Sequence, residues 1–194
     1  NGKAAIIPSA NLVKHHADCE YPFRQDSNFW YLTGFDEPNS VALFLSHKPK
    51  GERFILFVAP KDVIGEVWHG FRWGLKGAEN VFKADKAHSI DDFKKLLSSY
   101  MEGAEEIVFS IGKHKEIETI VLEAFSRQLE GSSRLGSGAN SISSPERYLN
   151  EMRLIKSDFE IKRMKEATQI SAEAHELVRK YVSSKSNERQ IQGL

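Results

Sequence analysis

Apolar residues in the first half of the chain fall in short runs that polar turn residues separate. The runs are Ala4–Ile7, Val41–Leu45 and Phe54–Ala59, and their β-branched and bulky residues are typical of strands. Between the last two runs, Pro49 and Gly51 indicate a turn, so a hairpin is expected there. Because the last two runs are apolar throughout, both faces of the sheet should be covered.

Further along the chain the apolar spacing changes to that of helices. A helix is predicted to begin after Ser89, since Asp92 can complete its N-terminal cap. Residues 107–111 predict another strand, and residues 116–130 predict a second helix that ends at Gly131. Alternating strands and helices indicate an α/β fold.

A stretch rich in Gly and Ser, residues 131–145, divides the chain. It has no apolar period, so we expect a linker there, between a domain at 1–144 and a second one that begins at 145–194. In the second part, Ser157 and Glu160 form a capping-box pattern. The helix that follows has a stripe of small and apolar residues at steps of three or four: Ile161, Met164, Ala167, Ser171, Ala174, Val178 and Tyr181. Such a helix cannot bury its stripe alone, so we expect the rest of its domain to be missing.

Composition narrows the function classes. The 194 residues carry 27 basic and 27 acidic side chains, so the total charge gives no footprint for nucleic acid or an anionic membrane. No apolar run approaches the roughly 20 residues that span a bilayer. Cys19 is the only cysteine, which excludes an intrachain disulfide and fits a reducing compartment. A cytoplasmic location is the default expectation.

Two patterns resemble metal sites without completing one. His175 begins an HExxH-like pattern, but Arg179 stands where the second histidine is needed. His15, His16 and Cys19 lie close in sequence without a fourth ligand nearby. We therefore expect no metal site and no catalytic residues in this chain.

Two aromatic segments stand out. In residues 21–35, six aromatic side chains alternate with polar ones, and Phe29, Tyr31 and Phe35 are expected in the core. In residues 66–74, large side chains including Trp68 lie among glycines. The second segment is either an exposed binding loop or a loop whose tryptophans fold back onto the core.

Three segments carry a family resemblance: YPFRQDSNFWYLTGFDEP at 21–38, EVWHGFRWG at 66–74, and NEMRLIKSDFEIKRMKEATQISAEAH at 150–175. In this order they resemble the N-terminal domain of Xaa-Pro aminopeptidases (aminopeptidase P, of the creatinase/prolidase type) and its junction with the catalytic domain. The resemblance implies a mixed sheet flanked by helices, ribonuclease-H-like, plus the first helix of a pita-bread catalytic domain.

The resemblance also implies a mechanism. In the family, two Asp, one His and two Glu of the catalytic domain hold two divalent metals, usually Mn²⁺, which share a hydroxide nucleophile. None of those ligands can be matched here, so the parent is expected to be active and this chain inactive alone. Its substrates would be peptides with proline in the second position.

For the N-terminal domain the resemblance implies a role in forming homo-oligomers, dimers or tetramers, and in closing the mouth of the active site. Trp68 matches a tryptophan that reaches toward a neighbouring subunit's site, and Arg134 is the candidate for an arginine that points toward substrate. Two alternatives stay open. One is prolidase, which cleaves Xaa-Pro dipeptides. The other is a catalytically inactive protein-binding relative, like the large subunit of the FACT histone chaperone.

Overall fold

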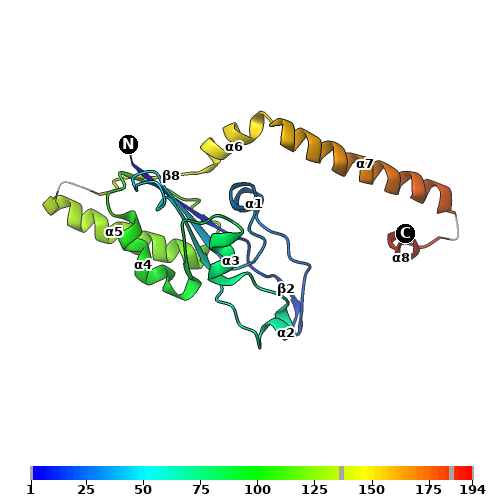
Figure 1. Ribbon diagram of the computed structural model, residues 1–194, viewed down its shortest axis with the longest axis horizontal. Helices are drawn as coiled ribbons and strands as arrows, with labels where there is room; N and C mark the ends of the chain where they lie inside the picture. The colour runs from blue at the N-terminus through cyan, green and yellow to red at the C-terminus, as the bar shows by residue number, and fades with distance from the viewer. Residues whose placement is uncertain (1, 136–137, 184–185, 194) are drawn as a thin grey trace. The chain divides into compact units, whose positions relative to one another are not determined.

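The computed structural model describes residues 2–135, 138–183 and 186–193, and the chain divides into two compact units, residues 1–147 and 148–194. A six-stranded sheet forms the centre of the first unit (Figure 1). In order across the sheet, its strands are β6 (Lys86–Ser89), β5 (Phe54–Val58), β4 (Val41–Leu45), β1 (Lys3–Pro8), β7 (Glu106–Val108) and β8 (Ile142–Ser143).

The sheet is mixed, because β4 alone runs against the other five strands. It is antiparallel to β1 and to β5, while the pairs β5–β6, β1–β7 and β7–β8 are parallel. The predicted hairpin around Pro49 and Gly51 is confirmed as the β4–β5 turn, with Leu43 opposite Ile55. The carboxyl ends of the five parallel strands therefore meet at one edge, which we call the carboxyl edge.

Helices cover both faces of this sheet, as the apolar strands predict. Successive strand residues point to opposite faces: Ile6 belongs to one buried cluster and Ile7 to the other. The helices α4 (Phe93–Met101) and α5 (Lys115–Leu135) pack on the first cluster. The helices α1 (Ser27–Thr33) and α3 (Gly74–Asn80) pack on the second.

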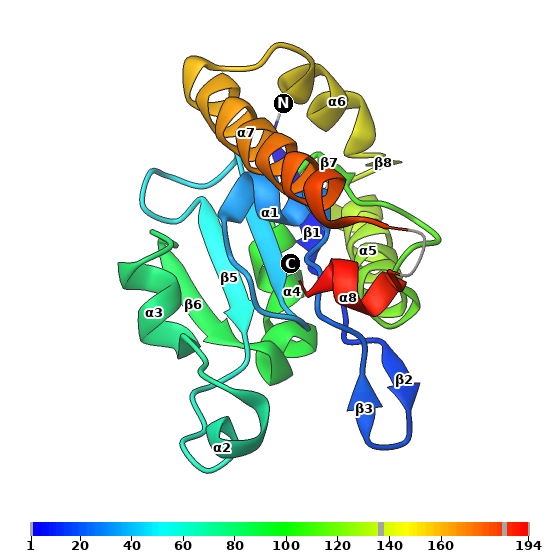
Figure 2. The ribbon, with the colours of Figure 1, turned by 90° about the vertical axis from the view of Figure 1, so that its right-hand side faces the viewer.

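Smaller elements complete the unit. They are the hairpin of β2 (Lys14–His16) and β3 (Cys19–Glu20), the short helix α2 (Glu66–His69), and the 3-10 turn η1 (Ile90–Asp92) that leads into α4. Figure 2 shows the β2–β3 hairpin and α2 extending from the carboxyl edge of the sheet. The sequence pattern predicted neither, because short exposed elements leave no apolar period.

The helix predicted over residues 116–130 continues past its expected end. Helix α5 includes Gly131 and ends at Leu135, so residues 131–135 are helical rather than linker. A glycine inside a helix costs only about 1 kcal/mol relative to alanine. In a helix of 21 residues this cost is not enough to stop it.

Capping residues at both ends define the bounds of helix α1. The Asp26 carboxylate accepts the N–H groups of Asn28 and Phe29, both at 2.9 Å, and so caps the start. Gly34 ends the helix with φ of 64°, a left-handed conformation that glycine adopts without steric cost. Between these caps, the buried Phe29 side chain faces the second apolar cluster.

Gln25 joins three parts of the chain through one amide side chain. Its Oε1 accepts the N–H of Ala10 at 2.8 Å and the N–H of Asp26 at 2.9 Å. Its Nε2 donates to the carbonyls of Phe35 at 3.1 Å and Glu37 at 2.9 Å. All four hydrogen-bonding positions of the amide are therefore used, and they fix the exit of β1, the start of α1 and the entry to β4.

The second unit is helical. It contains most of α6 (Glu146–Leu154), then α7 (Asp158–Tyr181) and α8 (Glu188–Gln192). The capping box predicted at Ser157 and Glu160 is confirmed at the start of α7, and the stripe residues Ile161 and Met164 are exposed. Among the helices of the described ranges, none is long and apolar enough to cross a bilayer.

We predict that Gln25→Ala lowers the free energy of unfolding by about 2–4 kcal/mol, because two N–H and two carbonyl groups lose their partner. Urea unfolding measured by circular dichroism would show it. Gln169→Ala is the matched control, since the Gln169 amide donates only to Glu173 on the exposed surface of α7, and this variant should change stability by less than about 0.5 kcal/mol. Equal losses in the two variants would contradict the role assigned to Gln25.

Candidate functional site

Three long segments of the first unit begin at the carboxyl edge. Residues 9–25 leave β1 there, residues 59–73 leave β5, and residues 109–114 leave β7. In α/β sheets, ligands bind outside the carboxyl ends of parallel strands, where loops can change without disturbing the core. This edge is therefore the candidate functional face.

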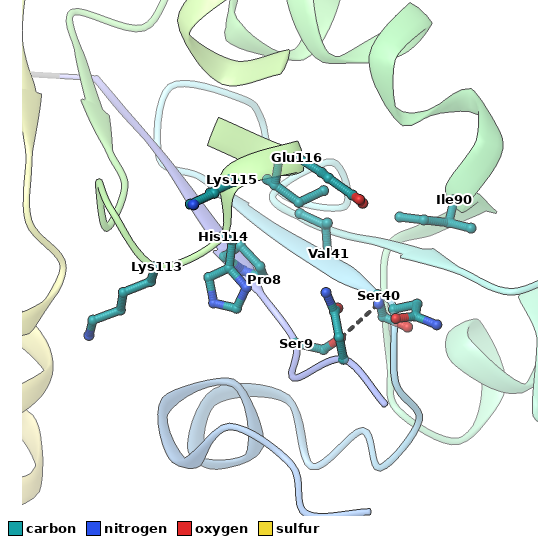
Figure 3. Close-up of a pocket in the computed structure, with 12 residues that line it drawn as sticks. Pro8, Ser9, Ser40, Val41, Ile90, Lys113, His114, Lys115 and Glu116 are labelled. Carbon is teal, nitrogen blue, oxygen red and sulfur yellow. Dashed lines mark hydrogen bonds between the residues drawn. The ribbon is translucent and has the colours of Figure 1, made fainter. Parts of the chain in front are cut away.

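A cavity of about 340 Å³ opens at this edge, between the end of β1, the start of β4 and the start of α5 (Figure 3). Polar backbone and side-chain groups line its floor. Ser9 and Ser40 are buried there and bond each other, since the Ser40 N–H donates to Ser9 Oγ at 2.7 Å. Around them are Pro8, Asn11, Asn39, Val41, Ile90, Lys113, His114, Lys115, Glu116 and Ile117.

Among the titratable groups that line this cavity, His114 has a shifted pKa. Burial lowers the pKa of the His114 imidazole, and the positive charge of Lys113 lowers it further, while Asp26 acts in the opposite direction. The imidazole is therefore neutral at pH 7. Lys113 itself forms an ion pair with Glu146. The cavity can thus offer a neutral hydrogen-bonding ring to a small polar group, and nothing in the sequence pattern had marked His114.

The second feature of the edge is the segment Lys61–Trp73, which we call the tryptophan loop. Its tip is apolar and open to solvent: the exposed fractions are 80% for Ile64, 79% for Val67 and 81% for Trp68. Trp73 instead packs edge-to-face on Phe82, with the ring centres 5.3 Å apart. Trp68 is therefore exposed, as the first interpretation expects, and Trp73 folds back onto the core, as the second expects. A binding role for the exposed tip stays a prediction.

Contacts inside the tryptophan loop define its shape. Lys61 Nζ lies 3.4 Å from Glu66 Oε1 and 4.4 Å from the centre of the Phe71 ring. Glu66 Oε1 also accepts the Arg72 N–H at 3.2 Å. At the end of the loop Gly74 has φ of 61°, and a Cβ there would lie 3.0 Å from Lys61 Cβ. The chain can close on itself at this point because residue 74 has no side chain.

The structure does not bring the two predicted site residues together. Trp68 lies in α2, beyond the carboxyl edge. Arg134 lies in the last turn of α5, whose 21 residues begin at that edge and span roughly 30 Å. The Arg134 side chain lies outside the described part of the structure.

The described residues include no group of three or more His, Cys, Asp or Glu side chains that could hold a metal ion. His15, His16 and Cys19 lie on the exposed β2–β3 hairpin, where His15 packs against Tyr21 with ring centres 4.6 Å apart. Arg179 occupies the second position of the HExxH-like pattern and pairs with Glu176 at 2.8 Å. These residues do not fit a metal centre.

Comparison with known proteins gives one consistent answer. Residues 1–109 match the family profile "Aminopeptidase P, N-terminal domain". The chain is 36% identical over 175 residues to an Xaa-Pro aminopeptidase of Haemophilus influenzae, a match that covers 89% of this chain and 37% of the relative.

Solved structures agree with the sequence comparison. Pseudomonas aeruginosa aminopeptidase PepP matches with a TM-score of 0.88 and 29% identity over 98% of this chain and 43% of that one. Zn-substituted Escherichia coli aminopeptidase P in complex with product matches with the same TM-score, identity and coverage. The chain thus spans less than half of the length of these proteins.

We predict that His114 titrates with a midpoint below the ordinary value of about 6.5, because burial disfavours its charged form. The midpoint is measured from the imidazole proton shifts by NMR between pH 4 and 8. Since the unfolded chain binds this proton more readily, His114 lowers stability as pH falls below about 6.5. Lys113→Gln should raise the midpoint by removing a neighbouring positive charge, and a wild-type midpoint at or above 6.5 would refute the prediction.

Proposed function

The chain belongs to the aminopeptidase P family, as its N-terminal region, and from this we propose that it is the non-catalytic N-terminal part of an Xaa-Pro aminopeptidase. The observation that carries the proposal is the agreement of the fold with two solved aminopeptidases P over 98% of the chain. In this proposal, residues 1–144 are the N-terminal domain and residues 145–194 begin the catalytic domain.

The parent enzyme, in this proposal, removes the N-terminal residue that precedes proline from peptide substrates. The related Escherichia coli structure is described as zinc-substituted, which supports a divalent metal in the parent. We propose two metals, with Mn²⁺ as the native ion. When bound, such a pair would polarise the scissile carbonyl and supply a hydroxide nucleophile. In this proposal the metal ligands belong to the catalytic domain, since the described residues of this chain do not fit a metal centre.

We propose that this chain contributes to oligomerisation and to closing the mouth of the parent enzyme's active site. The tryptophan loop supports this role, since Ile64, Val67 and Trp68 expose an apolar tip that costs free energy in water and becomes favourable against a partner. We propose Trp68 as an inter-subunit or substrate-pocket residue in a homo-oligomer, a dimer or tetramer. Arg134 is proposed for the same class of role on the strength of the family resemblance alone.

Helix α7 supports the placement of a domain boundary before it. Its apolar residues Phe159, Ile170 and Tyr181 are more than 60% exposed, and a stripe of this kind is stable when further helices or strands cover it. We propose that the remainder of a catalytic domain provides that cover. A cytoplasmic location for the parent is part of the same proposal.

A peptidase assay tests the catalytic proposal. The full-length parent and the 194-residue chain are each given Mn²⁺, an Xaa-Pro-Xaa tripeptide and an Xaa-Pro dipeptide. We predict that the parent cleaves the tripeptide and that the chain alone is silent. Preference for the dipeptide would assign the parent to prolidase instead. Silence of both proteins with metal present would favour a catalytically inactive protein-binding relative.

A second prediction concerns self-association. We expect Trp68→Ala to weaken it at least about tenfold, because the loss of one well-packed interface tryptophan costs more than about 1.4 kcal/mol. Sedimentation equilibrium of the parent measures it. Trp30→Ala is the matched control, since Trp30 is 50% exposed on α1, away from the tryptophan loop. A monomeric wild type at high concentration, or equal effects of the two variants, would contradict the proposal.

A further inference from the structure

Glu37 is a carboxylate in the interior of the first unit. Only 4% of its surface is exposed. Its Oε1 accepts the backbone N–H of Trp73 at 2.5 Å, and its Oε2 has no hydrogen-bond partner among the described residues. Burying an ionisable group with one oxygen unsatisfied costs free energy. A glutamate at this position therefore needs a reason other than stability.

The position of Glu37 supplies one. Its own backbone is fixed, because its carbonyl accepts from Gln25 Nε2 and it precedes the buried Pro38. Its side chain then reaches a residue that is 36 positions away in sequence. Glu37 thereby joins two segments, residues 21–38 and the tryptophan loop, and it does so at the point where the loop leads into α3.

The tryptophan loop has few other means of being held in place. The contacts of Lys61, Glu66, Phe71 and Arg72 described above lie within the loop, so they set its shape and not its placement. Trp73 connects it to the rest of the unit: its backbone N–H bonds Glu37, its ring packs on Phe82, and its indole N–H donates to the exposed Asp36 at 3.2 Å.

We propose that Glu37 is a positioning residue, whose carboxylate fixes the tryptophan loop on the 21–38 segment and so sets where Trp68 is presented. The backbone N–H of Trp73 is the group it holds, five residues from Trp68 in a loop whose internal contacts transmit the placement. The use of that placement, to present Trp68 at an active-site mouth or subunit interface, rests on the proposed function. The anchoring itself does not.

The pKa of Glu37 shows that its ionised carboxylate does not add to the global stability of the fold. Burial raises the pKa of Glu37; the bond from the Trp73 N–H and the charge of Arg72 lower it, and Asp36 and Glu66 raise it again. A raised pKa means that the stability this group contributes is present below about 4.5 and is lost as pH rises through the folded value. Above the folded value the ionised Glu37 therefore adds nothing to global stability, whereas a charged carboxylate accepts the Trp73 N–H more strongly than a neutral one.

Two variants of nearly the same size distinguish the effect of side-chain length at residue 37 from the effect of its charge. Glu37→Gln keeps the length of the side chain and an oxygen that can accept the Trp73 N–H, whereas Glu37→Asp keeps the charge but withdraws the oxygens by one methylene. Hydrogen exchange followed by NMR on the 194-residue chain reads the Trp73 amide directly. We expect exchange at least tenfold faster in Glu37→Asp, and within about threefold of wild type in Glu37→Gln. Tryptic cleavage after Lys61 and Arg72 should accelerate in the same order.

Two controls exclude general loosening. The amide of Leu56, in the centre of β5, should exchange at the wild-type rate in both variants. Glu79→Ala removes another carboxylate that accepts a backbone N–H, that of Ala87 at 3.0 Å, and should leave Trp73 unchanged. Wild-type exchange of Trp73 in Glu37→Asp would overturn the proposal, and so would equal acceleration at Leu56 or in Glu79→Ala.

The functional consequence is read in the parent enzyme. If the tryptophan loop forms part of the active-site mouth, Glu37→Asp raises KM for an Xaa-Pro-Xaa tripeptide at least threefold and changes kcat less than twofold. A change confined to kcat would overturn positioning of Trp68 for substrate. A wild-type parent without peptidase activity would refute the proposed function alone, because the exchange rates of Trp73 are measured without any substrate.

Discussion

The four hydrogen bonds that the Gln25 amide accepts and donates set the geometry on which the functional face depends. They tie the exit of β1 at Ala10 to the start of α1 at Asp26 and to the entry of β4 at Phe35 and Glu37. Without them, three irregular stretches of backbone would have to satisfy buried polar groups separately. Part of the density of polar residues between the aromatics of residues 21–38 follows from this requirement, since the side chains of Gln25, Asp26 and Thr33 each bond backbone groups that packing alone would leave open.

A chain of hydrogen bonds connects Gln25 to the tryptophan loop. Gln25 holds the backbone of Glu37, and Glu37 holds the backbone of Trp73. Apolar burial fixes the sheet and its helices, but it is non-directional and cannot place an exposed loop. Hydrogen bonds are directional, and they place the loop. This explains how a segment with a solvent-exposed apolar tip around Trp68 can have a defined position on a small α/β unit.

The two family segments that lie far apart in sequence are thus one structural feature. Residues 21–38 supply the buried acceptors, and residues 66–74 supply Trp73 as donor and Trp68 as the exposed side chain. The cavity beside His114 lies at the same carboxyl edge, where loops from β1, β5 and β7 gather. The arrangement concentrates adaptable residues on one side of the sheet and leaves its two covered faces to stability.

Local pattern determined the strands at Ala4–Ile7, Val41–Leu45 and Phe54–Ala59, the covered sheet and the capping box at Ser157, because apolar runs and caps act over a few residues. It also indicated the family. It did not give the continuation of α5 through Gly131, where the rest of the helix outweighs one residue's weak preference. Tertiary structure alone decided that Glu37 meets Trp73, because that bond joins residues 36 positions apart. It also decided that Trp73 is packed while Trp68 is exposed, because no local period distinguishes the two tryptophans.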